Sequence, residues 1–143
     1  PSLVGSEMCI RDRLKPVMTL KARVSQVRNL PKGATVSYGR TYRAEEGITS
    51  AVIPAGYADG YPRRLSNMGK VFINGKAYNQ IGRICMDVCM ADVTGGDVRQ
   101  GDEAILFGRG GMSIEDVAQI VGTINYELTC LVTERANRVY VNN

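Results

Sequence analysis

The sequence predicts a mainly β domain, a compact barrel-like or sandwich-like fold of about eight short strands with one short helix. Short extended runs separated by turn residues recur along the chain, which is typical of all-β domains. Asn74 and Gly75 lie between two such runs and form a strong hairpin signal, because a type I′ turn needs positive φ at both positions. Residues 114–122 are the one stretch with a convincing helical pattern.

The strands are predicted from alternation and from the residues that end each run. Apolar and polar residues alternate over residues 18–25, which indicates a half-buried strand. Residues 48–53 form a strand that ends at Pro54, because proline cannot donate to a central ladder. The other predicted strands are residues 36–42, 70–73, 76–78, 81–84, 88–92, 104–107 and 138–141.

The helix at residues 114–122 has signals at both ends. Ser113 is a favourable N-cap, and Asp116 three residues later completes a variant of the capping box. Gly122 suits the left-handed conformation that ends a helix. The helix is short, so it must pack on the sheet to be stable. Its apolar stripe consists of Ile114, Val117, Ala118, Ile120 and Val121.

Composition limits the classes of function. The chain has 143 residues, 44% of them hydrophobic, which is enough for one domain with its own core. Its formal net charge is +4, and no basic run indicates a nucleic-acid tract, so an anionic small ligand is the milder implication. No run of about 18 apolar residues predicts a membrane span.

The sequence contains no histidine. A Ser-His-Asp triad, a Cys-His pair and a His-ligated metal site are therefore excluded within this chain, and proton transfer must use Tyr, Lys, Asp, Glu or Cys. Cys85 and Cys89 do not have the C-x-x-C spacing of zinc and redox sites. A disulfide framework is not expected at this size, so the sequence indicates a reducing, cytoplasmic setting.

Two tyrosine-rich stretches are candidates for a functional site. If residues 36–42 form a strand, Tyr38, Arg40 and Tyr42 share a face, and a phenol near a cation is a candidate proton carrier. The alternative is an ordinary strand with aromatic packing. Residues 54–62 form a loop rich in glycine, proline and tyrosine, which either lines a pocket or is a plain surface loop.

The first residues do not join this pattern. Residues 1–13 are too polar and too short for a signal peptide, and we expect them to be a non-native or artefactual leader. The domain itself is expected to span residues 14–143.

Four segments, in order, resemble the C-terminal domain of bacterial alanine racemase. They are residues 36–42, 56–64, 82–87 and 123–127. The resemblance implies a homodimeric enzyme that interconverts L- and D-alanine with pyridoxal phosphate, in active sites built from both chains. It also implies an N-terminal α/β barrel that carries the cofactor lysine, which this chain lacks. We therefore expect this chain alone to be inactive.

The resemblance assigns roles to single residues. Tyr38 matches the base for L-alanine, and Met86 matches the position whose backbone contacts the substrate carboxylate. Tyr57 matches an aromatic at the entrance to the site. The remaining matches are Arg63, Arg83 and Ile124 in the entrance corridor, and Tyr126 at the cofactor phosphate or the mouth of its own chain's site.

Several readings stay open from the sequence. Arg83 could pair with Asp87, and Met86 could belong to the core. The full enzyme could be a serine, lysine or broad-specificity racemase of the same family. The chain could also be a non-catalytic orphan β module that serves binding or assembly.

Overall fold

The computed structural model describes residues 15–141, so the expected leader at residues 1–13 lies outside the described part. The expected mainly β fold is confirmed: seven antiparallel strands form one sheet in the order β1-β9-β6-β7-β8-β5-β2, and β3 pairs with β4 in a two-stranded arm. The strands are β1 (Leu20–Arg23), β2 (Gln26–Leu30), β3 (Thr35–Val36), β4 (Tyr42–Arg43), β5 (Ile48–Ile53), β6 (Lys70–Ile73), β7 (Lys76–Ile81), β8 (Cys89–Asp92) and β9 (Glu103–Phe107). The helices are α2 (Ile114–Val121) and α3 (Asn125–Leu131), with short 3₁₀ turns η1 (Tyr38–Arg40), η2 (Tyr57–Asp59) and η3 (Arg63–Leu65).

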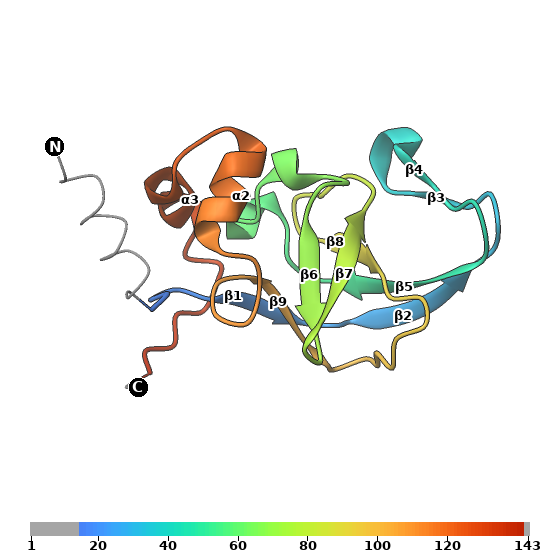
Figure 1. Cartoon of the computed structure of the whole chain (residues 1–143), viewed down its shortest axis with the longest axis horizontal. Helices are drawn as coiled ribbons and strands as arrows, with labels where there is room; N and C mark the ends of the chain where they lie inside the picture. The colour runs from blue at the N-terminus through green and yellow to red at the C-terminus, as the bar shows by residue number, and fades with distance from the viewer. Residues whose placement is uncertain (1–14, 142–143) are drawn as a thin grey trace, which may run out of the picture.

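The seven-stranded sheet curls because its two end strands are consecutive in the chain. Only Val24 and Ser25 separate β1 from β2, yet these strands lie at opposite ends of the sheet order. The Val24 N–H donates to the Asp102 carbonyl next to β9, whereas the Ser25 N–H donates to the Val52 carbonyl in β5, both at 2.9 Å. Figure 1 shows β1 and β2 as one continuous length of chain that runs across the lower half of the molecule. The result is a barrel-like sheet with few free edges.

The core fills this curled sheet, and α2 covers part of it. Val117, Ala118 and Val121 of α2 are buried in the same apolar cluster as the inward residues of the strands. The expected helix is confirmed in detail, since the Ser113 hydroxyl accepts the Asp116 N–H at 3.0 Å. Gly122 ends the helix with φ 77°, as the cap requires. Figure 1 shows α2 and α3 together at one end of the molecule.

Local turn chemistry explains the strands that the sequence predicted correctly. Asn74 and Gly75 have φ values of 52° and 76°, as the type I′ hairpin between β6 and β7 requires. β5 has the predicted bounds, with Pro54 directly after it. The position of this hairpin and the end of β5 are thus set by the residues at the turn and by Pro54.

Two expected strands do not form, and two elements of the structure were not predicted. Residues 81–84 do not form a strand, because β7 ends at Ile81 and Gly82 turns the chain with φ 73°. Residues 138–141 are irregular rather than extended in a sheet. β2 was not predicted, because its residues are only half-buried or exposed and show no clear alternation. α3 was not predicted either, since Ile124 at its N-cap provides no side-chain acceptor.

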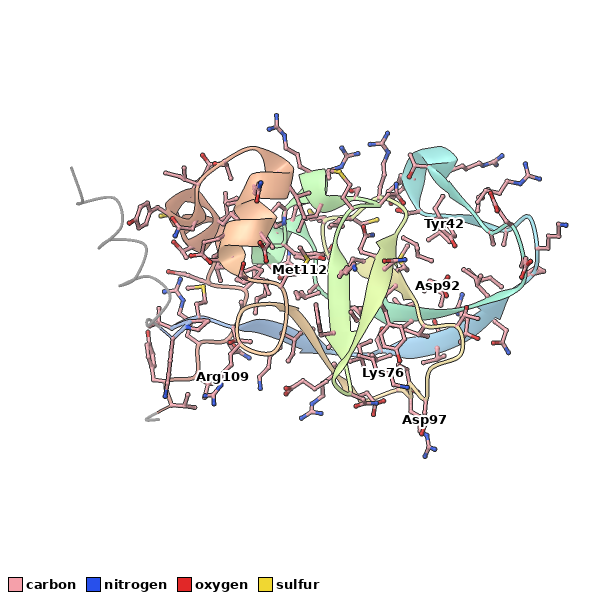
Figure 2. All side chains as sticks on the ribbon, in the orientation of Figure 1. Tyr42, Lys76, Asp92, Asp97, Arg109 and Met112 are labelled. Atoms are coloured by element: carbon pink, nitrogen blue, oxygen red, sulfur yellow. The ribbon has the colours of Figure 1, made fainter. Side chains whose placement is uncertain are left out.

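The predicted strand at residues 36–42 is also wrong. β3 ends at Val36, and positive φ values at Ser37 (66°), Gly39 (72°) and Arg40 (50°) coil the chain into η1. Tyr38, Arg40 and Tyr42 therefore do not share a strand face. Figure 2 shows Tyr42 between the β3–β4 arm and β5. Burial there raises the pKa of Tyr42, and the carboxylate of Asp92 raises it further.

Candidate active site

The residues that the sequence singled out lie on connecting segments rather than in the strands of the large sheet. These segments are η1, η2, η3, the loop between β7 and β8, and the α2–α3 region. In Figure 1 they lie along the upper side of the molecule. Functional side chains commonly lie on loops that a rigid sheet holds in place. All the predicted site residues thus lie on segments along one side of the curled sheet (Figure 1).

Tyr38 lies on a turn that is fixed at its base. Its side chain is 75% exposed. The preceding Ser37 has φ 66° and ψ −178°, a region that is essentially restricted to glycine and costs other residues about 1–3 kcal/mol. The Ser37 hydroxyl lies 2.7 Å from the Arg83 carbonyl, to which it donates, and 3.3 Å from the Cys85 sulfur. The phenol is therefore presented outward from a strained and anchored backbone.

The loop after β7 packs directly against this turn. A Cβ on Gly82 would lie 2.8 Å from the Val36 carbonyl oxygen. A Cβ on Gly39 would lie 3.1 Å from Nε of Arg83. Both glycines also have positive φ. The absence of side chains thus lets the two segments meet, and it places the Arg83 guanidinium against η1.

Buried Gln80 fixes the start of the same loop. It is 1% exposed, and its amide nitrogen donates to the carbonyls of Ile81 (3.0 Å) and Gly82 (2.8 Å). Its amide oxygen accepts the Asn67 N–H at 2.7 Å. The Asn67 side chain in turn accepts the Gly82 N–H at 2.6 Å and donates to the Thr41 hydroxyl at 3.1 Å. Because Gln80 is buried and its amide is satisfied, it holds the start of this loop rigidly, whereas Asn67 extends the network to the surface.

Tyr57 and Met86 lie on two segments that are paired through their backbones. The Tyr57 N–H donates to the Cys85 carbonyl at 3.1 Å, and the Ala58 N–H donates to the Met86 carbonyl at 3.0 Å. The Tyr57 side chain is 45% exposed and that of Met86 is 49% exposed, so Met86 does not belong to the core. Gly56 permits this pairing, because its backbone lies against the carbonyls of Cys85 and Met86.

Arg135 links the same two segments from the far end of the chain. Its guanidinium forms ion pairs with Asp59, at 3.3 Å, and with Asp87. The hydrogen bond with Asp87 raises the pKa of Arg135, and the charge of Asp59 adds to this effect. Asp87 thus pairs with Arg135, and not with Arg83 as one reading of the sequence had it. The single charge of Arg135 offsets one of the two carboxylate charges, and the guanidiniums of Arg63 and Arg83 add two further positive charges to this face.

A pocket of about 510 Å³ lies between the η2–η3 segment and the α2–α3 region. Tyr57 and Arg63 line it together, so the structure brings these two predicted residues to one place. Its other lining residues include Arg64, Gly122, Thr123 and Leu128. Tyr38, Arg83 and Met86 do not line this pocket and lie instead on η1 and the β7–β8 loop. Tyr57 connects the two places, because it lines the pocket and its N–H donates to a carbonyl of the β7–β8 loop.

Ile124 and Tyr126 lie on the surface next to this pocket. Their side chains are 61% and 69% exposed, respectively. Over residues 15–141, no helix is long and apolar enough to cross a membrane, and no cluster of side chains suited to a metal ion occurs.

Comparison with known proteins identifies the family. A family model described as "Alanine racemase, C-terminal domain" matches residues 17–140. The chain belongs to the alanine racemase C-terminal domain family. It is 50% identical over 135 residues to the alanine racemase of Clostridium perfringens (strain SM101 / Type A), a match that covers 92% of this chain and 35% of that protein. The resemblance carried by the four sequence segments is confirmed.

Solved racemases have the same fold. An alanine racemase of Clostridium difficile 630, in complex with cycloserine, superposes with a TM-score of 0.86 at 41% identity, over 91% of this chain and 35% of that one. The alanine racemase of Bartonella henselae with covalently bound pyridoxal phosphate superposes with a TM-score of 0.82 at 34% identity, over 86% of this chain and 34% of that one. The alanine racemase C-terminal domain described here thus spans about a third of the length of its relatives.

Proposed function

We propose that this chain is the C-terminal part of a cytoplasmic, pyridoxal phosphate-dependent alanine racemase, with residues 14–143 as its β domain and residues 1–13 as a leader foreign to it. The enzyme interconverts L- and D-alanine as a homodimer, and this domain supplies Tyr38 to the active site of the partner chain. The observation that carries the proposal is the exposed Tyr38 phenol on an anchored, strained turn. Similarity to alanine racemases supports the choice of reaction.

Racemisation needs two proton carriers, one on each face of the substrate. Tyr38 takes the α-proton of L-alanine, and a lysine of the N-terminal barrel serves the opposite face, so the substrate does not have to turn over. A base works only within hydrogen-bond reach of the proton that it removes, which explains why Tyr38 is held on a fixed turn. Pyridoxal phosphate, when bound, draws electron density from the α-carbon and so makes this proton acidic enough to remove.

The side chains on this face fit an anionic substrate and a phosphorylated cofactor. The phenol of Tyr126 is exposed, and Arg63 and Arg83 provide guanidiniums for an entrance corridor in which Tyr57 and Ile124 are the apolar residues. The Met86 carbonyl already accepts the Ala58 N–H, so the Met86 N–H is the backbone group that we assign to the substrate carboxylate. We assign the covalent link to the cofactor to the lysine of the barrel.

A racemisation assay of the complete protein, loaded with cofactor, tests this function. Alanine is expected to give the highest kcat/KM among alanine, serine and lysine. Comparable values for serine or lysine would favour a broad-specificity racemase of the same family. Failure to racemise any of the three would contradict the proposal and favour the orphan β module.

The chain on its own is expected to bind no cofactor covalently and to leave alanine unracemised, because the lysine that holds the cofactor and serves as the other base belongs to the barrel. The measurement is an absorbance spectrum of the purified chain after incubation with pyridoxal phosphate and removal of the excess, followed by polarimetry with L-alanine. A stable absorbance band from a covalently bound cofactor, or measurable turnover, would contradict this assignment of parts.

A further inference from the structure

Ser37 combines two features that a plain linker residue does not need. Its backbone lies in a region that suits glycine, with φ 66° and ψ −178°. A glycine there would remove the strain, yet the chain carries a side chain with a hydroxyl. The strain is therefore retained together with a hydroxyl that glycine would lack.

The hydroxyl of Ser37 bridges two segments that are far apart in sequence. It lies 2.7 Å from the Arg83 carbonyl, to which it donates, and the Cys85 sulfur lies 3.3 Å away. The Ser37 carbonyl accepts the Arg40 N–H at 3.3 Å and so closes η1. Ser37 thereby ties the base of the Tyr38 turn to the loop that continues into Met86.

We propose that Ser37 is a positioning residue for Tyr38. Its hydroxyl holds the strained backbone in place, and this fixes the phenol relative to the Met86 backbone. This inference rests on the proposed function, because it takes Tyr38 as the base and Met86 as the contact for the substrate carboxylate. Without the tether, the turn relaxes and the phenol loses its alignment with the α-proton.

Ser37→Ala in the complete holoenzyme is expected to lower kcat by about 10- to 100-fold, since a displacement of about 1 Å of a reacting group has an effect of this size. KM for alanine is expected to change far less, because Ser37 does not contact the substrate. Ser37→Gly relieves the strain but also removes the tether, so it is expected to lower kcat as well. The matched control is Ser25→Ala. Ser25 lies between β1 and β2, and the substitution removes the hydrogen bond that its hydroxyl donates to the Val52 carbonyl of β5.

Kinetic isotope effects distinguish positioning from a general loss of structure. Proton removal by Tyr38 becomes more rate-limiting in Ser37→Ala, so the effect with α-deuterated L-alanine is expected to rise. The effect with α-deuterated D-alanine is expected to fall or stay unchanged, because the barrel lysine removes that proton. Hydrogen exchange over residues 36–41 provides a readout that does not depend on turnover, and it is expected to be faster in both Ser37 variants than in Ser25→Ala.

Three outcomes would contradict the role of Ser37 or the proposed function on which it rests. Wild-type kcat and isotope effects in Ser37→Ala and Ser37→Gly would show that the hydroxyl does not position the phenol. A fall in kcat with unchanged isotope effects in both directions would reduce Ser37 to a structural role. A wild-type holoenzyme that does not racemise alanine would overturn the proposed function itself, whereas a racemising wild type with unaffected variants would overturn only the role of Ser37.

Discussion

Tyr38→Phe in the complete enzyme is expected to lower kcat for alanine by about 10²- to 10⁴-fold, the range that a positioned general acid or base contributes. The ring remains and only the phenolic oxygen is lost, so folding and cofactor content are expected to stay at the wild-type level. The values of kcat/KM for the two enantiomers must fall by the same factor, because a catalyst does not change the equilibrium between them. The measurements are kcat with each enantiomer and cofactor content from absorbance.

The matched control for this prediction is Tyr140→Phe, which removes the same oxygen from a tyrosine that is 89% exposed near the end of the described chain. Its kcat is expected to equal that of the wild type. Near-normal turnover of both enantiomers by Tyr38→Phe would contradict the role of Tyr38 as a base.

Gly56→Ala is expected to have the largest effect on folding. The new Cβ would lie 2.1 Å from the Cys85 carbonyl oxygen and 2.5 Å from that of Met86, and both are backbone atoms. Relief requires the two segments to separate, which breaks the bonds that the Tyr57 and Ala58 N–H groups donate. We expect the free energy of unfolding to fall by about 3 kcal/mol or more, at the upper end of overpacking effects.

Gly47→Ala is the matched control for this substitution. The nearest atom to its new Cβ is the Leu30 carbonyl oxygen at 3.8 Å, which is an ordinary contact. Its unfolding free energy in urea is expected to stay within about 0.5 kcal/mol of the wild-type value. Equal unfolding midpoints for the two variants would contradict the close approach described at Gly56.

The sequence predicted those parts of the fold in which the signal is local. The β6–β7 hairpin follows from Asn74 and Gly75, and α2 follows from its caps and apolar stripe. The turn at Ser37 could not be predicted, because its backbone angles are imposed by a hydrogen bond to Arg83, 46 residues away. Read alone, residues 36–42 favour a strand, and the tertiary contact overrides that preference.

In the candidate site too, contacts between residues far apart in sequence could not be predicted. The positions of Tyr38, Tyr57 and Met86 came from family resemblance, and the structure adds the residues that hold these segments. Arg135 was missed because it meets Asp87 across 48 residues of sequence, and no periodic pattern marks such a pair. Gln80 was missed because a glutamine at the end of a strand reads as a surface residue, although it is fully buried here.

Mixing two inactive variants tests most directly whether this domain supplies Tyr38 to the partner chain. One variant is Tyr38→Phe, and the other replaces the proposed cofactor lysine of the barrel in the complete protein. When both chains are co-expressed in equal amounts, half of the dimers are mixed and each has one intact site, so about a quarter of the wild-type activity is expected. Activity no higher than that of the separate variants would contradict a site built from two chains.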